Sequence, residues 1–122
     1  MDRRQAAASL FALAMIPPAL AEPNQGETVL IERLIALVGS SKEVIFIRNG
    51  TEATPDAAAR HLRDKYDYFR MDISTADDFI RLCGTRSEVT KRPYEVRFSD
   101  GYKQPAAEWL GAQLKKMRAS TN

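Results

Sequence analysis

The apolar residues of this chain recur mostly at the spacing of amphipathic helices. Between Glu27 and Val38 they follow a helical period while charged residues take the other side, and Gly39 is expected to end this helix. A second helix is predicted from about Pro55 to Phe69. Its start is typical, because a hydroxyl cap, Thr54, precedes a proline and a carboxylate, Asp56.

Two more helices are predicted in the second half of the chain. Thr75 and Asp78 have the spacing of a capping box, and the short helix that they open is expected to end near Gly84. The last helix begins near Pro105, and its apolar residues share one face. They are Trp109, Leu110, Leu114 and Met117.

Two segments have the pattern of strands. Val44 to Arg48 is short and mainly β-branched or aromatic, and Pro93 to Ser99 alternates between apolar and charged residues. We expect the two to pair antiparallel, with a possible extension by Tyr102 and Lys103. Asn49-Gly50 would normally announce a hairpin, but a helix start follows it, so we expect it to lead into a loop.

These elements predict one α+β domain with the order α-β-α-α-β-α. About four helices would pack on a short two- or three-stranded antiparallel sheet. Because a two-stranded ribbon is marginal alone, helix packing must hold it. The domain is expected to occupy residues 22–122, with its core at residues 27–118.

The first 21 residues have the pattern of a cleavable signal peptide. Arg3 and Arg4 precede an apolar stretch, a Pro-Pro pair follows, and the small residues Ala19 and Ala21 suit a signal peptidase, which would cut after Ala21. This predicts export to the periplasm, with no stable membrane insertion after cleavage. The alternative is an N-terminal anchor that is never cleaved.

Charge and cysteine content reduce the range of possible functions. The 18 Lys and Arg residues include Arg3 and Arg4, and the 16 acidic residues include Asp2, so the mature chain has a net charge of +1. This near-balance argues against general nucleic-acid binding. Cys83, the only cysteine, shares a helical face with apolar residues, which favours a buried, unreactive thiol. Pairing between two chains is the alternative.

The helix that carries His61 holds the first candidate site. His61, Lys65 and Tyr68 lie near one another at helical spacing, and Arg48 and Asn49 leave the preceding strand on what could be the same side. Such a cluster could bind an anion or move a proton. A lone histidine has no metal-ligand spacing, so neither a metal nor another cofactor is expected. The alternative is a histidine that only fixes the joint between strand and helix.

A second candidate is the polar loop from Thr85 to Tyr94. Ser87 can donate a hydrogen bond, and Arg86 and Arg92 supply positive charge, which suits a phosphate or an acidic polymer. The alternative is a solvated loop that leads into an edge strand. Tyr68 and Tyr102 are the aromatic residues most expected to be exposed, where they could anchor a partner.

Several segments together resemble a known family. They are "RNGTEATPDAAARHLRDKYDYF", "STADDFI", "TRSEVTKRPYEVRFSDG" and "AAEWLGAQLKK", and the resemblance spans about Glu27 to Arg118. In this order they are similar to the small exported bacterial proteins typified by YfeK, a family of unknown function. The resemblance implies a Gram-negative periplasmic protein and no particular reaction. The family loop often has glycine where this chain has Lys91.

Three functions remain open from the sequence. The first is a non-enzymatic binding or accessory module of the cell envelope that contacts a small anionic ligand or an envelope protein. The second is a small hydrolase with His61 as general base. The third is a purely structural interaction protein in which the region of Arg48 and His61 serves folding alone.

Overall fold

The structure, a computed structural model, describes residues 25–120. The predicted signal peptide and its cleavage site after Ala21 lie outside the described residues. Between residues 25 and 120, no helix is both long enough and apolar enough to cross a membrane.

All four predicted helices are present. They are α2 (Gln25–Ser40), α3 (Pro55–Phe69), α4 (Ala76–Cys83) and α5 (Ala106–Ser120), and a short 3₁₀ turn, η2 (Arg70–Asp72), follows α3. The predicted starts are confirmed. The Thr54 side chain accepts a hydrogen bond from the amide of Ala57, and Thr75 and Asp78 form a reciprocal capping box.

The predicted end of the first helix at Gly39 is wrong. Helix α2 continues through Gly39 to Ser40, and Gly39 is not among the glycines with positive φ. The glycine instead permits close packing of two helices. A Cβ at this position would lie 3.3 Å from the Cβ of Ala59 in α3, which is tighter than ordinary contact.

The sheet has four antiparallel strands in the order β2-β1-β3-β4. Their bounds are Val44–Arg48 for β1, Thr51–Ala53 for β2, Glu95–Phe98 for β3 and Lys103–Pro105 for β4. The predicted antiparallel pairing of the two main strands is confirmed, with Phe46 opposite Val96. The α+β class is therefore confirmed, although the sheet has more strands than predicted.

The rejection of a hairpin at Asn49-Gly50 is wrong. Arg48 pairs directly with Thr51, and the two turn residues between them have positive φ angles of 53° and 78°, as a type I′ turn requires. The sequence gives little sign of the second strand, because Thr51-Glu52-Ala53 is short and has no apolar alternation. An ion pair of 2.6 Å from Arg97 of β3 to Glu52 helps to hold this edge strand in the sheet.

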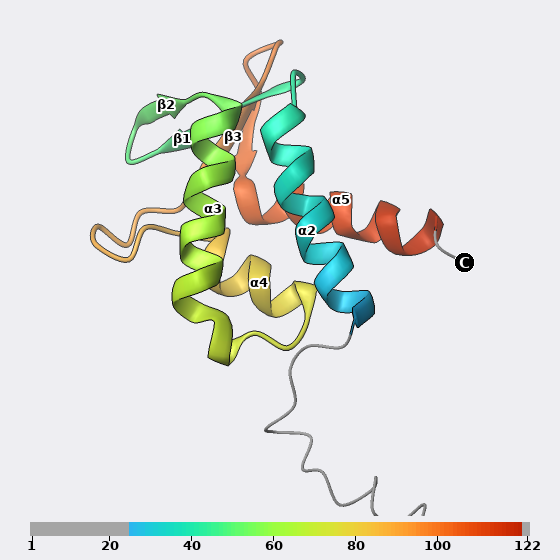
Figure 1. Cartoon of the computed structure of the whole chain (residues 1–122). Coiled ribbons are helices and arrows are strands. Elements are labelled where there is room, and N and C mark those ends of the chain that lie inside the picture. Colours follow the sequence, from blue (N-terminus) through green and yellow to red (C-terminus); the bar gives the residue numbers. More distant parts are fainter. Residues whose placement is uncertain (1–24, 121–122) are drawn as a thin grey trace, which may run out of the picture.

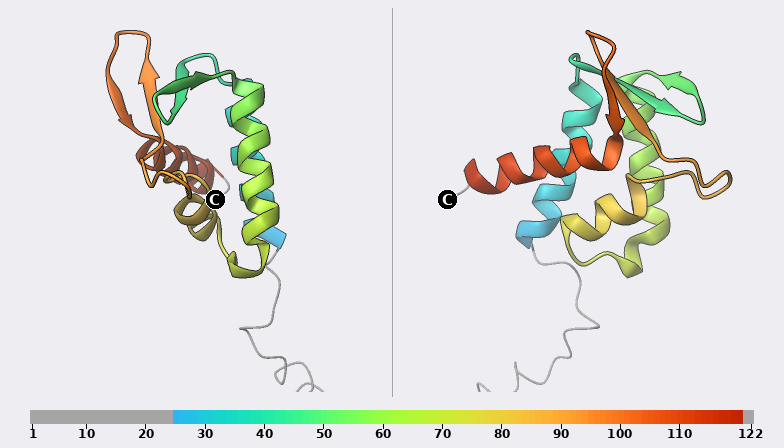
Figure 2. Two further views of the ribbon diagram at one scale, coloured as in Figure 1. Left: turned by 90° about the vertical axis from the view of Figure 1, so that its left-hand side faces the viewer. Right: turned by 180° about the vertical axis from the view of Figure 1, so that it is seen from behind.

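One face of the sheet packs against the helices to form the core. Val44 and Phe46 of β1 and Val96 of β3 are buried, and the Phe46 ring meets Trp109 of α5 edge-on at 5.5 Å. Helices α2 and α3 lie side by side, and the β1–β2 hairpin lies over the N-terminal end of α3 (Figure 1). Figure 2 shows β3 and β4 set apart from α3, on the side of α5.

The predicted burial of Cys83 is confirmed. The side chain is fully buried in the core, and this burial raises the pKa of the thiol to about 12. The thiolate, which is the reactive form, is therefore a negligible species at neutral pH.

Candidate functional site

The candidate site forms where the core face of the sheet ends above α3. Phe46 of β1 and Val96 of β3 lie opposite each other in the sheet. Arg48 lies two residues beyond Phe46, and Tyr94 lies two residues before Val96. Because side chains alternate along a strand, both residues continue the core-facing row past its apolar part. His61 reaches them from the middle of α3.

His61 connects these two residues. Its Nε2 lies 2.8 Å from the hydroxyl oxygen of Tyr94, and its Nδ1 lies 3.4 Å from Nη1 of Arg48. A guanidinium only donates hydrogen bonds, so Nδ1 must accept and Nε2–H must donate to Tyr94. The contacts therefore select a neutral imidazole with its proton on Nε2.

The electrostatic surroundings of His61 favour the same neutral form. Partial burial lowers the pKa of the imidazole below its usual value, and the positive charges of Arg48 and Lys65 lower it further, while Asp64 acts in the opposite direction. At neutral pH the ring is uncharged, and the positive charge beside it is that of Arg48.

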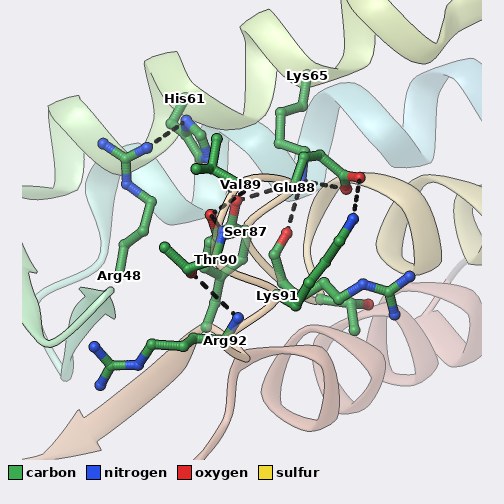
Figure 3. A network of polar contacts seen from close by, with 12 residues as sticks. Arg48, His61, Lys65, Ser87, Glu88, Val89, Thr90, Lys91 and Arg92 are labelled. Atoms are coloured by element: carbon green, nitrogen blue, oxygen red, sulfur yellow. Dashed lines mark hydrogen bonds and ion pairs between the residues drawn. The ribbon is translucent and has the colours of Figure 1, made fainter.

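Lys65 fastens the polar loop to α3. Its Nζ donates to the backbone carbonyl of Arg86 at 2.9 Å, to a carboxylate oxygen of Glu88 at 3.3 Å and to the hydroxyl of Tyr94 at 3.3 Å. Lys65 is only 8% exposed, and these bonds use all three N–H donors of its buried ammonium. Figure 3 shows Lys65 directed into this network. Its role is to position the loop.

The loop from Thr85 to Arg92 has its own internal support. The buried Ser87 accepts hydrogen bonds from the amides of Val89 and Thr90, each at 3.2 Å, and the Thr90 hydroxyl donates to Asn49 in the hairpin turn. Lys91 has a φ of 64°, in the left-handed region that favours glycine.

A cleft of about 420 Å³ opens between α3, the end of β1 and this loop. Five of the residues singled out in the sequence line it: Arg48, His61, Lys65, Tyr68 and Ser87. Tyr68 is 81% exposed, as expected. Elements far apart in the sequence thus bring the first candidate cluster and part of the second to one place.

Three other predicted residues do not line the cleft. Asn49 contacts the loop through Thr90, and Arg86 contributes its backbone carbonyl to Lys65. The guanidinium of Arg92 lies against the hairpin turn, where a Cβ on Gly50 would be 3.5 Å from it, and it points away from His61 (Figure 3).

Sequence reasoning missed Tyr94 as a site residue. Its place in an alternating strand indicated a core side chain, and it is indeed 8% exposed. Its hydroxyl nevertheless sits between His61 and Lys65. The available signal was its position just before β3, where a core-facing tyrosine brings its polar end to the edge of the core. Asp64 and Glu88, which also line the cleft, were missed as well.

Within residues 25–120, no three His, Cys, Asp or Glu side chains are grouped so that they could hold a metal ion. The protein is therefore a small α+β domain with a cleft in which an arginine, a neutral imidazole and a phenol lie beside a paired ammonium and two carboxylates.

This chain belongs to DUF5329, a family of unknown function, which it matches over residues 25–118. It is 33% identical over 86 residues to the uncharacterized protein YfeK of Salmonella typhimurium, an alignment that covers 70% of this chain and 72% of that protein. The resemblance to the YfeK-like family is thereby confirmed. No solved structure matches the chain.

Proposed function

We propose that this protein is an exported binding module of the cell envelope that holds an anionic group in the cleft beside Arg48. The observation that carries the proposal is the state of Arg48. Its exposed guanidinium has no carboxylate partner within the described chain, and its one side-chain hydrogen bond there is the long one to the neutral ring of His61. Most of its N–H donors therefore remain available to a ligand.

The hydroxyl of Tyr94 is a second hydrogen-bond donor of the cleft that remains available to a ligand. The hydroxyl oxygen of Tyr94 accepts hydrogen bonds from His61 and from Lys65, so its own O–H proton has no acceptor among residues 25–120. The residue is buried and lines the cleft. A carboxylate or phosphate oxygen placed between Arg48 and Tyr94 would accept from both.

A hydrolase with His61 as general base is less well supported. A general base needs a lone pair that faces the substrate. In the neutral tautomer the lone pair of His61 is on Nδ1, which faces Arg48, and no Ser, Thr or Cys of the described region bonds to the ring. The cleft favours binding over hydrolysis.

The binding role predicts the result of replacing Arg48. Arg48→Gln is expected to weaken the binding of inorganic phosphate or acetate about 10- to 100-fold, as the loss of charge-assisted hydrogen bonds implies. Calorimetric titration at fixed ionic strength measures it. Because Arg48 is exposed at the end of its strand, the thermal midpoint without ligand should change little.

Arg33→Gln, on the exposed side of α2, is the matched control and should bind like the wild type. Equal binding by both variants, or no anion that binds at all, would refute the proposal. A His61→Ala variant addresses the structural alternative. If it loses much stability while no anion binds the wild type, this region serves folding alone.

The proposed location has its own test. Expressed in a Gram-negative host, the protein should be released with the periplasmic fraction, and mass spectrometry should show a chain that begins at Glu22. Ala21→Lys should block processing and leave the precursor in the membrane fraction. A wild-type chain with an intact N-terminus in the membrane would instead support an uncleaved anchor.

A further inference from the structure

A second, smaller cavity lies beside the cleft. It has a volume of about 80 Å³, and nearly all of its lining is apolar, with Phe46 of β1, Leu62 of α3 and Leu110 of α5 among the contributors. Arg48, His61 and Tyr94 line both this cavity and the cleft. Asp64, Lys65 and Glu88 line only the cleft, so the three shared side chains stand at the boundary between a space with more charged side chains and one with fewer.

We infer that the natural ligand is a small amphiphile whose anionic head binds in the cleft at Arg48 while its short apolar chain occupies this cavity. The inference rests on the proposed anion-binding function and names the chemical class of the ligand. Charge complementarity favours this orientation, because the Arg48 guanidinium lies at the boundary with the cleft, whereas the other charged residue that lines the cavity, Glu95, would repel an anionic head.

Small side chains from several elements leave this space open. Ala57 and Ala58 lie on α3, Ala53 on β2 and Gly84 at the end of α4. The buried hydroxyl of Tyr94, whose proton has no acceptor in the described chain, lies at its boundary with the cleft. The anionic head of an amphiphile at this boundary would accept a hydrogen bond from the Tyr94 hydroxyl in place of water from the cleft.

The path for the chain passes between Arg48 and His61. Their contact, at 3.4 Å, is longer than the two contacts that the Tyr94 hydroxyl makes with His61 and Lys65. Arg48 is also exposed, so its side chain can move aside without disturbing the core. At roughly 30 Å³ for each water-sized group, the cavity accommodates a chain of about three carbons.

A chain-length series tests the inference on the purified protein. Calorimetric titration would use acetate, propionate, butyrate, pentanoate and heptanoate, with a parallel series from methyl to butyl phosphate and with pentan-1-ol as the uncharged probe. The dissociation constant should fall about fourfold per methylene from acetate to butyrate, whose chain beyond the carboxylate has three carbons, and then level off. The tighter of the two anionic series identifies the head as carboxylate or phosphate.

Variants that fill the cavity identify the site of the chain. Ala58→Leu should abolish the dependence on chain length while acetate binds as before, and Ala57→Leu serves if the first variant does not fold. Ala112→Leu, exposed on α5, is the matched control and should retain the dependence. An intact dependence in a folded, filled variant would overturn the inference.

The other outcomes separate this inference from the proposed function. Anions that bind the wild type with no dependence on chain length would overturn the amphiphile and leave the proposed function standing. Pentan-1-ol that binds as tightly as pentanoate would refute recognition of the anionic head, and with it both proposals. No binding by any probe would also overturn both.

Discussion

Lys65→Met is expected to lower the free energy of unfolding by about 2 to 3 kcal/mol. Methionine retains an unbranched apolar side chain at this buried position and removes the ammonium. The Arg86 carbonyl then loses its 2.9 Å donor, and the Tyr94 hydroxyl loses one of its two donors. Glu88 is half-exposed and regains water, so it adds little to the loss. Urea denaturation of the purified protein measures the change.

The same substitution should loosen the loop that closes the cleft. Amide hydrogens between Arg86 and Arg92 should exchange faster with solvent, because Lys65 fixes this segment to α3. Lys116→Met, exposed on α5, is the matched control and should change stability by less than about 0.5 kcal/mol. A Lys65→Met protein as stable as the wild type would show that the desolvation cost of the buried ammonium offsets its hydrogen bonds.

The helices could be predicted from the sequence because local signals fixed them. The starts at Thr54 and Thr75 follow from cap chemistry, which depends on residues three or four positions apart. The prediction of a helix end at Gly39 was wrong because the role of this glycine depends on a residue far away in the sequence. It admits Ala59 of another helix, and no rule on neighbouring residues distinguishes that use of glycine from a helix cap.

The β1–β2 hairpin shows the opposite error. Asn49-Gly50 is a strong local turn signal, but Thr51-Glu52-Ala53 has no apolar pattern that would support a second strand. An edge strand needs none, because its backbone hydrogen bonds and the ion pair between Glu52 and Arg97 hold it in the sheet. The chemistry of the turn was therefore better evidence than the composition of residues 51–53.

The site was predictable only in part, and for a physical reason. Helical spacing placed His61, Lys65 and Tyr68 together, and strand alternation could have added Tyr94. The direction of each cation in the 85–92 loop depends on the left-handed Lys91 and the turn at Ser87, which are features of the folded loop. Arg86 and Arg92 therefore looked equivalent to Arg48 in the sequence, although only Arg48 lines the cleft.

Phe79→Ala is expected to cost about 3 to 5 kcal/mol, the largest effect of any single change considered for this domain. Phe79 is fully buried and meets the ring of Tyr66 edge-on at 5.6 Å. It is the largest of the buried side chains that attach the eight-residue helix α4 to the core; the others are Ala76, Ile80 and Cys83. Since small domains have a total stability of about 5 to 15 kcal/mol, the variant should be largely unfolded well below the melting temperature of the wild type.

The loss of Phe79 is also expected to affect the cleft. Helix α4 leads directly into the loop that carries Ser87 and Glu88, so a loosened α4 should also open the cleft. Phe79→Leu, which keeps most of the volume, should lose clearly less stability and retain anion binding. Phe98→Ala, at a partly buried ring stacked on Tyr102, should also cost less. Thermal and urea unfolding rank the three variants, and a Phe98→Ala protein less stable than Phe79→Ala would place the centre of the core nearer the sheet than α4.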